Sequence, residues 1–137
     1  MLKADAEEIK ELSSRTGLLG FLRSGMEGFR KTLACIESAE RNPRNYDLVL
    51  VGTPIWAGNL SSPVRSYLTN FSKRFKKVAF FCTCGSSGEK AFKEMEGICG
   101  KPPVAALELT RKEVSAGEHL AEIKHFVRQL KAGRSCL

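Results

Sequence analysis

The segment that decides the fold reads Tyr46-Asp47-Leu48-Val49-Leu50-Val51-Gly52-Thr53-Pro54-Ile55-Trp56-Ala57-Gly58. Its first part, residues 47–51, is a short apolar run that ends at a glycine. Continuous apolar runs of this length are typical of strands that are covered on both faces, because such strands have no solvent-facing side. We therefore predict a buried strand over residues 47–51, followed by a loop that carries the only tryptophan of the chain.

Two later apolar runs, over residues 78–83 and 104–109, repeat this pattern. Each of the three runs is followed by residues that favour the start of a helix, which we expect near Ser62, Ser86 and Ser115. A strand-helix pattern repeated three times with short connections indicates βαβ units and a parallel sheet. The predicted fold is a three-layer α/β sandwich that forms a single domain over residues 1–137.

The N-terminal third is less regular. Apolar residues recur there at helical spacing, which predicts a helix that three glycines weaken: Leu18, Leu22, Met26, Phe29 and Leu33. Residues 4–12 fit a weak edge strand or a helix, and their periodicity does not decide between the two. Residues 39–45, which include Pro43, are typical of a loop.

Composition narrows the class of protein. Hydrophobic residues make up 42% of the chain, so a core can form, yet no apolar run approaches the roughly 20 residues of a membrane span. The N-terminus turns acidic at once and lacks the apolar region of a secretory signal, so we expect a cytoplasmic protein. The net charge is +7, with the densest basic run at residues 73–77. We interpret that run as a solvated helix end rather than a nucleic-acid surface.

The five cysteines are an odd number, and two of them lie in a strand-like run, which favours reduced thiols over a disulfide scaffold. The segment Cys82-Thr83-Cys84 offers two metal ligands, and Cys99 is the only further cysteine near in sequence. Buried core thiols are the interpretation that we favour.

Ligands of open parallel sheets bind beyond the carboxyl ends of the strands, so the loops at residues 52–61 and 84–88 are the candidate site. Trp56 offers the first loop a flat apolar face, for which a ligand and simple packing over the sheet edge are equally good explanations. The second loop is rich in glycine and serine. Its N–H groups suit an anion or a ring carbonyl, although ordinary helix capping is the more common role.

The residue pattern resembles the flavodoxin-like family. The segment from Tyr46 to Gly58, with the residues from Pro63 to Leu68, resembles the third strand and the flavin loop of that family. The segment from Phe81 to Gly88 resembles its second flavin loop, and the one from Leu2 to Ile9 its second-strand region. The resemblance implies that FMN is the cofactor. It also implies that no acid–base side chain is needed, and we expect His119 and His125 to be solvated surface residues.

The resemblance also assigns the site residues. It places around the isoalloxazine ring Thr53, Pro54, Ile55, Trp56, Ala57 and Gly58. It places on the pyrimidine side Cys84, Gly85, Ser86 and Gly88. The implied function is FMN-based electron transfer, or NAD(P)H-dependent reduction of flavins or quinones. The implied partners are a redox protein or a small-molecule acceptor.

The chain departs from the family at one place. Members open with a strand and a Ser/Thr/Gly-rich loop that holds the FMN phosphate, whereas this sequence starts at the second-strand region. We therefore expect weakened or lost FMN binding and an exposed sheet edge at residues 47–51, which a homo-oligomer would cover. The alternative function is a non-catalytic, truncated module for oligomer assembly or protein interaction. Nucleic-acid binding is a third and weaker reading.

Overall fold

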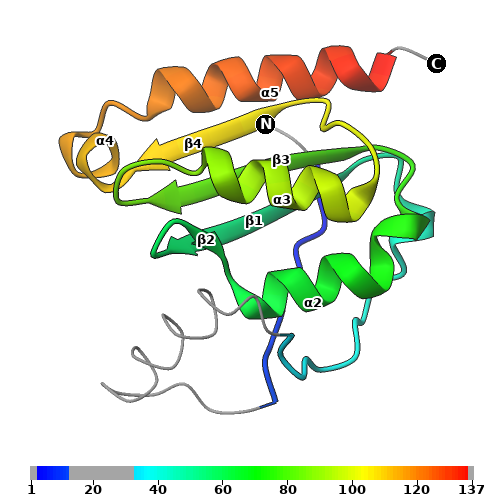
Figure 1. Ribbon diagram of the computed structural model, residues 1–137. Helices are drawn as coiled ribbons and strands as arrows, with labels where there is room; N and C mark the ends of the chain where they lie inside the picture. The colour runs from blue at the N-terminus through cyan, green and yellow to red at the C-terminus, as the bar shows by residue number, and fades with distance from the viewer. Residues whose placement is uncertain (1–2, 13–32, 136–137) are drawn as a thin grey trace.

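The computed structural model describes residues 3–12 and 33–135. Its centre is a four-stranded sheet in the order β2-β1-β3-β4 (Figure 1). The strands are β1 (Val49–Trp56), β2 (Asn59–Leu60), β3 (Val78–Cys84) and β4 (Ala106–Thr110). β1, β3 and β4 run parallel, and the short β2 is antiparallel to the end of β1. The predicted parallel arrangement is therefore confirmed.

Helices cover both faces of this sheet. α2 (Ser62–Phe71) and α3 (Glu89–Cys99) lie on one face, and α5 (Leu120–Ser135) lies on the other (Figure 1). A short α4 (Arg111–Ala116) and two 3₁₀ turns, η1 (Pro43–Asn45) and η2 (Ser72–Arg74), complete the described elements. The predicted three-layer α/β sandwich is confirmed.

β3 shows why its sequence is apolar throughout. Ala79 and Phe80 are both fully buried, although successive side chains point to opposite faces of a strand. Phe80 packs into the core on the side of α2 and α3, where its ring stacks on Phe92 with centroids 6.3 Å apart. Ala79 packs under α5 with Phe126. A strand covered on both faces has no polar side, as the sequence pattern predicted.

Several predicted boundaries were wrong. β1 continues past residue 51 through part of the predicted loop and ends at Trp56. The single helix expected from Ser115 is replaced by two helices. The first, α4, begins earlier, at Arg111, because the Thr110 side chain caps it in a capping box with Glu113. Gly117 then adopts a left-handed φ of 74° that ends α4, and α5 starts at Leu120.

The helix expected near Ser86 begins at Glu89, with Gly88 in the capping position and no side-chain hydrogen bond from that cap. The Glu89 carboxylate lies 2.7 Å from the Lys93 ammonium instead, and the Ser87 hydroxyl accepts the Glu89 N–H at 3.2 Å. α2 begins at Ser62 as predicted, with Ser61 in the capping position.

Residues 3–12 form neither the edge strand nor the helix between which the sequence did not decide. They contain one antiparallel bridge, between Glu11 and Ile36, and no helix. The Glu7 carboxylate accepts the backbone N–H groups of residues 40 and 41, at 2.6 and 3.1 Å, and the Tyr46 hydroxyl donates to Asp5 at 2.9 Å. The segment is thus tied to residues 40–46. The predicted helix through Leu18 lies outside the described residues, except for Leu33 at its end.

The basic run at residues 73–77 lies at the amino-terminal end of β3, where three of its four basic side chains have partners within the chain. The Lys76 ammonium lies 3.1 Å from Asp47, and the Arg74 guanidinium lies 5.2 Å from the centre of the Phe71 ring. Lys77 donates to the Gly133 carbonyl of α5 at 2.6 Å, where a cation suits the negative end of the helix. Across the described ranges, no helix is long and apolar enough to cross a bilayer.

Candidate functional site

The predicted loop after β1 is a tight β-hairpin. Trp56 pairs with Asn59, which leaves Ala57 and Gly58 as the two turn residues, with φ values of 48° and 73°. Two positive φ values define a type I′ turn, whose twist matches that of the flanking strands. Ala57 carries a Cβ into this left-handed region, which costs about 1–2 kcal/mol. The Asn59 side-chain amide donates to the Ala57 carbonyl at 2.9 Å and holds the turn.

Buried polar groups fix the hairpin on the helices behind it. The Thr53 and Ser61 hydroxyl oxygens lie 3.1 Å apart and bridge the two ends of the hairpin. Arg65 of α2 donates to the Leu60 carbonyl at 3.1 Å and to the Glu94 carboxylate of α3 at 2.8 Å. The Arg65 and Glu94 side chains are only 5% and 13% exposed. The tryptophan-bearing hairpin is therefore held by both helices of this face.

A large groove follows the edge of β1 that faces away from β3. Its volume is about 1310 Å³, and residues 3–9 form its far wall. Three of the predicted ring-site residues line it, namely Thr53, Pro54 and Trp56. Ile55, Ala57 and Gly58 belong to the hairpin but do not line the groove. Phe81, whose side chain is 39% exposed, and Tyr67 of α2 add aromatic surface.

The second predicted loop lies beside the hairpin at the same end of the sheet. Pro54 pairs with Thr83, so Gly85 and Ser86 leave β3 next to the hairpin, where both are exposed. Cys84 and Gly88 are buried, and the Gly88 N–H already donates to Glu108 of β4 at 2.9 Å. None of Cys84, Gly85, Ser86 and Gly88 lines the groove.

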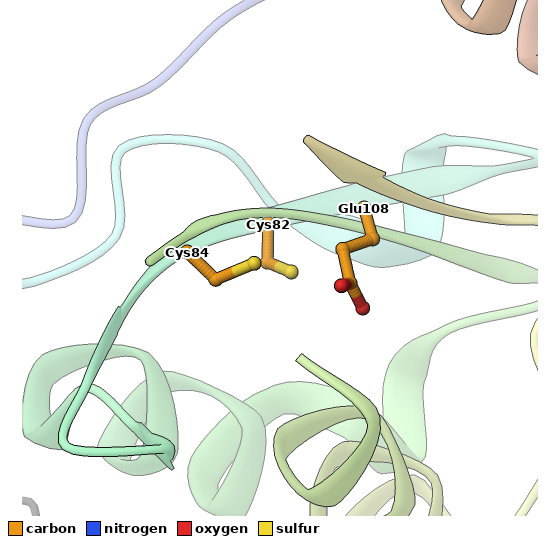
Figure 2. A group of neighbouring side chains, drawn as sticks. All are labelled: Cys82, Cys84 and Glu108. Carbon is orange, nitrogen blue, oxygen red and sulfur yellow. The ribbon is translucent and has the colours of Figure 1, made fainter. Parts of the chain in front are cut away.

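The thiols of β3 face a carboxylate that sequence reasoning missed. Cys82 pairs with Glu108 across β3 and β4, and the Cys82, Cys84 and Glu108 ligand atoms lie within 4.8 Å of one another (Figure 2). Burial, together with the neighbouring Cys84 and Glu108, raises the pKa of the Cys82 thiol to about 12. Burial and Glu108 also raise the pKa of the Cys84 thiol. The sequence signal for Glu108 was its charge inside an otherwise apolar run.

The predictions for Cys99 and for the two histidines had mixed outcomes. Cys99 is buried as predicted, but Glu108, and not Cys99, joins the two β3 thiols. His125 is exposed on α5 as expected. His119 is not on the last helix: it precedes α5 and is half-buried, so its assignment to the solvated surface was wrong.

Comparison with solved structures identifies the fold. The chain is similar to a flavoprotein from Lactobacillus acidophilus NCFM that was crystallised in complex with FMN, with a TM-score of 0.60 and 17% identity. This match covers 79% of this chain and 76% of the other. A putative flavoprotein from Bacteroides uniformis matches with a TM-score of 0.64 and 23% identity over 75% of this chain and 71% of the other.

A third match is a putative flavoprotein from Bacteroides eggerthii, with a TM-score of 0.53 and 23% identity over 65% of this chain and 57% of the other. No protein-family model and no curated protein sequence matches the chain. At these identities the three structures show the fold, which is flavodoxin-like.

Proposed function

We propose that this chain is an FMN-binding flavoprotein that holds the flavin ring at the carboxyl end of β1 and β3. The observation that carries the proposal is the strained hairpin that ends β1 and places Trp56 on the lining of the groove. Strained backbone that several contacts hold in place is common at ligand sites. The flavoprotein folds of the three similar structures, one of them crystallised with FMN, support the proposal.

The groove suits a planar, mostly apolar ring. Pockets for small ligands and cofactors usually have volumes of about 300–1,000 Å³, so about 1310 Å³ leaves space for a flavin and more. Trp56 offers the ring an apolar face. The exposed Gly85 lies beside the hairpin but outside the groove, and would let backbone approach a ring that extends past Trp56. FMN would supply the redox chemistry, and the residues of the chain would bind and orient the ring.

The redox role that we propose is electron transfer, or NAD(P)H-dependent reduction of flavins or quinones. The acceptor would be a small molecule or a redox protein that reaches the open side of the groove. The described cysteines are free thiols, and reduced thiols are typical of the cytoplasm, where we place this function.

Replacing Trp56 by alanine tests this site. The only tryptophan of the wild-type chain should lose fluorescence as FMN is added. Lost stacking of about 1 kcal/mol or more should weaken FMN binding at least about fivefold in the Trp56→Ala variant, as measured by flavin fluorescence. The matched control, Trp56→Phe, keeps an aromatic face and should retain most of the affinity. Equal affinity in all three proteins would place the ring elsewhere.

The open edge of β1 favours a second candidate function, oligomer assembly. β2 covers only Ile55 and Trp56 on that edge, and within residues 3–12 and 33–135 no strand pairs with the edge between Val49 and Pro54. An edge of this kind presents free N–H and C=O groups and invites pairing with another chain. We propose that a second copy of this chain is the partner, because the same groove would then be covered on both copies.

Sedimentation of the purified chain tests the assembly. We expect a dimer or a larger oligomer. Replacing Leu50, which lies on the open strand and is 36% exposed, by lysine should shift the protein toward the monomer because a charge at an edge opposes pairing. Lysine at Leu120, which is 59% exposed on α5, is the matched control and should change nothing. A wild-type protein that stays monomeric at all concentrations would contradict the assembly proposal and leave the flavin proposal untouched.

A further inference from the structure

Three potential metal ligands converge on one face of the sheet, away from the groove. Cys82 and Cys84 are two residues apart on β3, so both thiols point to the face that α3 covers. Glu108 lies opposite Cys82 on β4 and points to the same side (Figure 2). The two sulfurs and a carboxylate oxygen lie within 4.8 Å of one another. Three neighbouring positions of two paired strands thus bring these groups together.

The spacing is close to that of a tetrahedral zinc site. Bond lengths of about 2.3 Å to sulfur and about 2.1 Å to oxygen place two sulfurs about 3.8 Å apart, and a sulfur and an oxygen about 3.6 Å apart. Observed separations of up to 4.8 Å need to close by about 1 Å at most. Rotation of the Cys82, Cys84 and Glu108 side chains about their own bonds gives movement on that scale without any change of the backbone.

The amino terminus of α3 borders the three potential ligands. Gly88, the residue that caps α3, donates its N–H to the Glu108 carboxylate at 2.9 Å and so orients one ligand. A Cβ at Gly88 would lie only 2.4 Å from the Cys82 sulfur, so the positive end of α3 lies directly against the thiol. A helix amino terminus stabilises thiolate and carboxylate charge. Bonds from a neighbouring group that hold a ligand in place are a regular part of metal sites.

We propose that Cys82, Cys84 and Glu108 bind a thiophilic divalent cation, Zn²⁺, with a fourth position left for water or an exchangeable ligand. Binding replaces the two thiol protons, which pass to solvent, and the carboxylate coordinates without proton loss. Three protein ligands with one open position are the arrangement of exchangeable zinc sites rather than of closed structural ones. The proposal is independent of flavin binding.

Metal titration of the reduced, metal-free protein tests the site. We expect one Zn²⁺ per chain, measured by competition with a chromophoric chelator, and with Cd²⁺ a sulfur-to-metal charge-transfer band of two thiolates. A background variant in which Cys35, Cys99 and Cys136 are replaced by alanine should keep both signals. Replacing Cys82 or Cys84 by serine should halve the band and weaken Zn²⁺ binding at least about 100-fold. Loss of a group that only hydrogen-bonds to a metal ligand already lowers metal affinity about 10–100-fold.

A Glu108→Gln variant separates ligation from packing. It keeps both thiols and the shape of the carboxylate, so it should retain the two-thiolate Cd²⁺ band while its Zn²⁺ affinity falls. Zn²⁺ should also raise the melting temperature of the wild-type and background proteins but not that of the Cys84→Ser variant. The proposal is overturned if no equimolar binding occurs, or if the Cd²⁺ band survives when Cys82 and Cys84 are both serine.

Discussion

Replacing Arg65 by alanine should lower the free energy of unfolding by about 3–5 kcal/mol, the usual cost of removing one partner of a buried ion pair. The Arg65 guanidinium lies 2.8 Å from the Glu94 carboxylate and also donates to the Leu60 carbonyl of the hairpin. Its loss leaves the Glu94 carboxylate, which is only 13% exposed, without the Arg65 guanidinium. Chemical denaturation monitored by circular dichroism measures the change.

A double replacement provides the control. Arg65→Met combined with Glu94→Leu removes both charges and keeps apolar volume, so it should be far less destabilising than Arg65→Ala alone. The pair Lys93–Glu89 offers a matched surface comparison. Its nitrogen–oxygen distance is 2.7 Å but both side chains are more than 70% exposed, so Lys93→Ala should cost less than about 1 kcal/mol. A loss below about 1 kcal/mol for Arg65→Ala would show that the pair does not hold the hairpin.

FMN and riboflavin should bind this chain with nearly equal affinity. The residues that we propose for the ring lie at the carboxyl end of β3, whereas the basic run at residues 73–77 lies at its amino end. The seven residues of β3 separate the two by about 23 Å, at about 3.3 Å per residue, so that run cannot reach the phosphate of a ring-bound FMN. Two charge-assisted hydrogen bonds to a phosphate, at about 1.5–3 kcal/mol each, would instead make FMN bind about 10²–10⁴-fold more tightly than riboflavin.

Parallel titrations with the two flavins measure this ratio, with salt varied to expose any phosphate contribution. We expect a ratio near one that hardly depends on salt. FMN binding that is 100-fold tighter than riboflavin binding, and that weakens as salt rises, would contradict ring-only recognition. It would point to a phosphate site in the chain, for which Ser13-Ser14-Arg15-Thr16-Gly17, outside the described residues, is the segment to replace next.

The strands could be predicted from sequence because each contains a short apolar run. Of the three parallel strands, only β3 is buried on both faces, whereas β1 is buried on one face and Leu50 on its other face is exposed. The hairpin could not, because Gly52 and Pro54 are typical of loops. Pro54 is accepted in β1 because no described strand pairs with the open edge at that position, where a missing N–H costs nothing. Gly52 is accepted because the Phe81 ring of the next strand occupies the space of its Cβ, with a closest approach of 2.1 Å. Both reasons lie in neighbouring strands and not in local sequence.

The candidate site, like the strands, could be predicted only in part from local sequence. Trp56 was a candidate from its place after a predicted strand, where its position left a ligand and simple packing equally open, and the structure places it on the lining of the groove. Glu108 and the Arg65–Glu94 pair were missed because their partners are 20 or more residues away in sequence, and only the packing of α2, α3 and β4 brings them together. The pattern of a sequence reveals which face of an element is apolar, but it does not reveal which polar side chains meet across elements.

The most direct test of the proposed flavin site is an amide chemical-shift map of the ¹⁵N-labelled chain titrated with FMN. The largest changes should fall on the hairpin that carries Trp56 and on the loop of Gly85 and Ser86, at one end of the sheet. Lys76 and Lys77, at the other end, should shift little. Changes centred on residues 73–77, or no changes at millimolar FMN, would contradict the account.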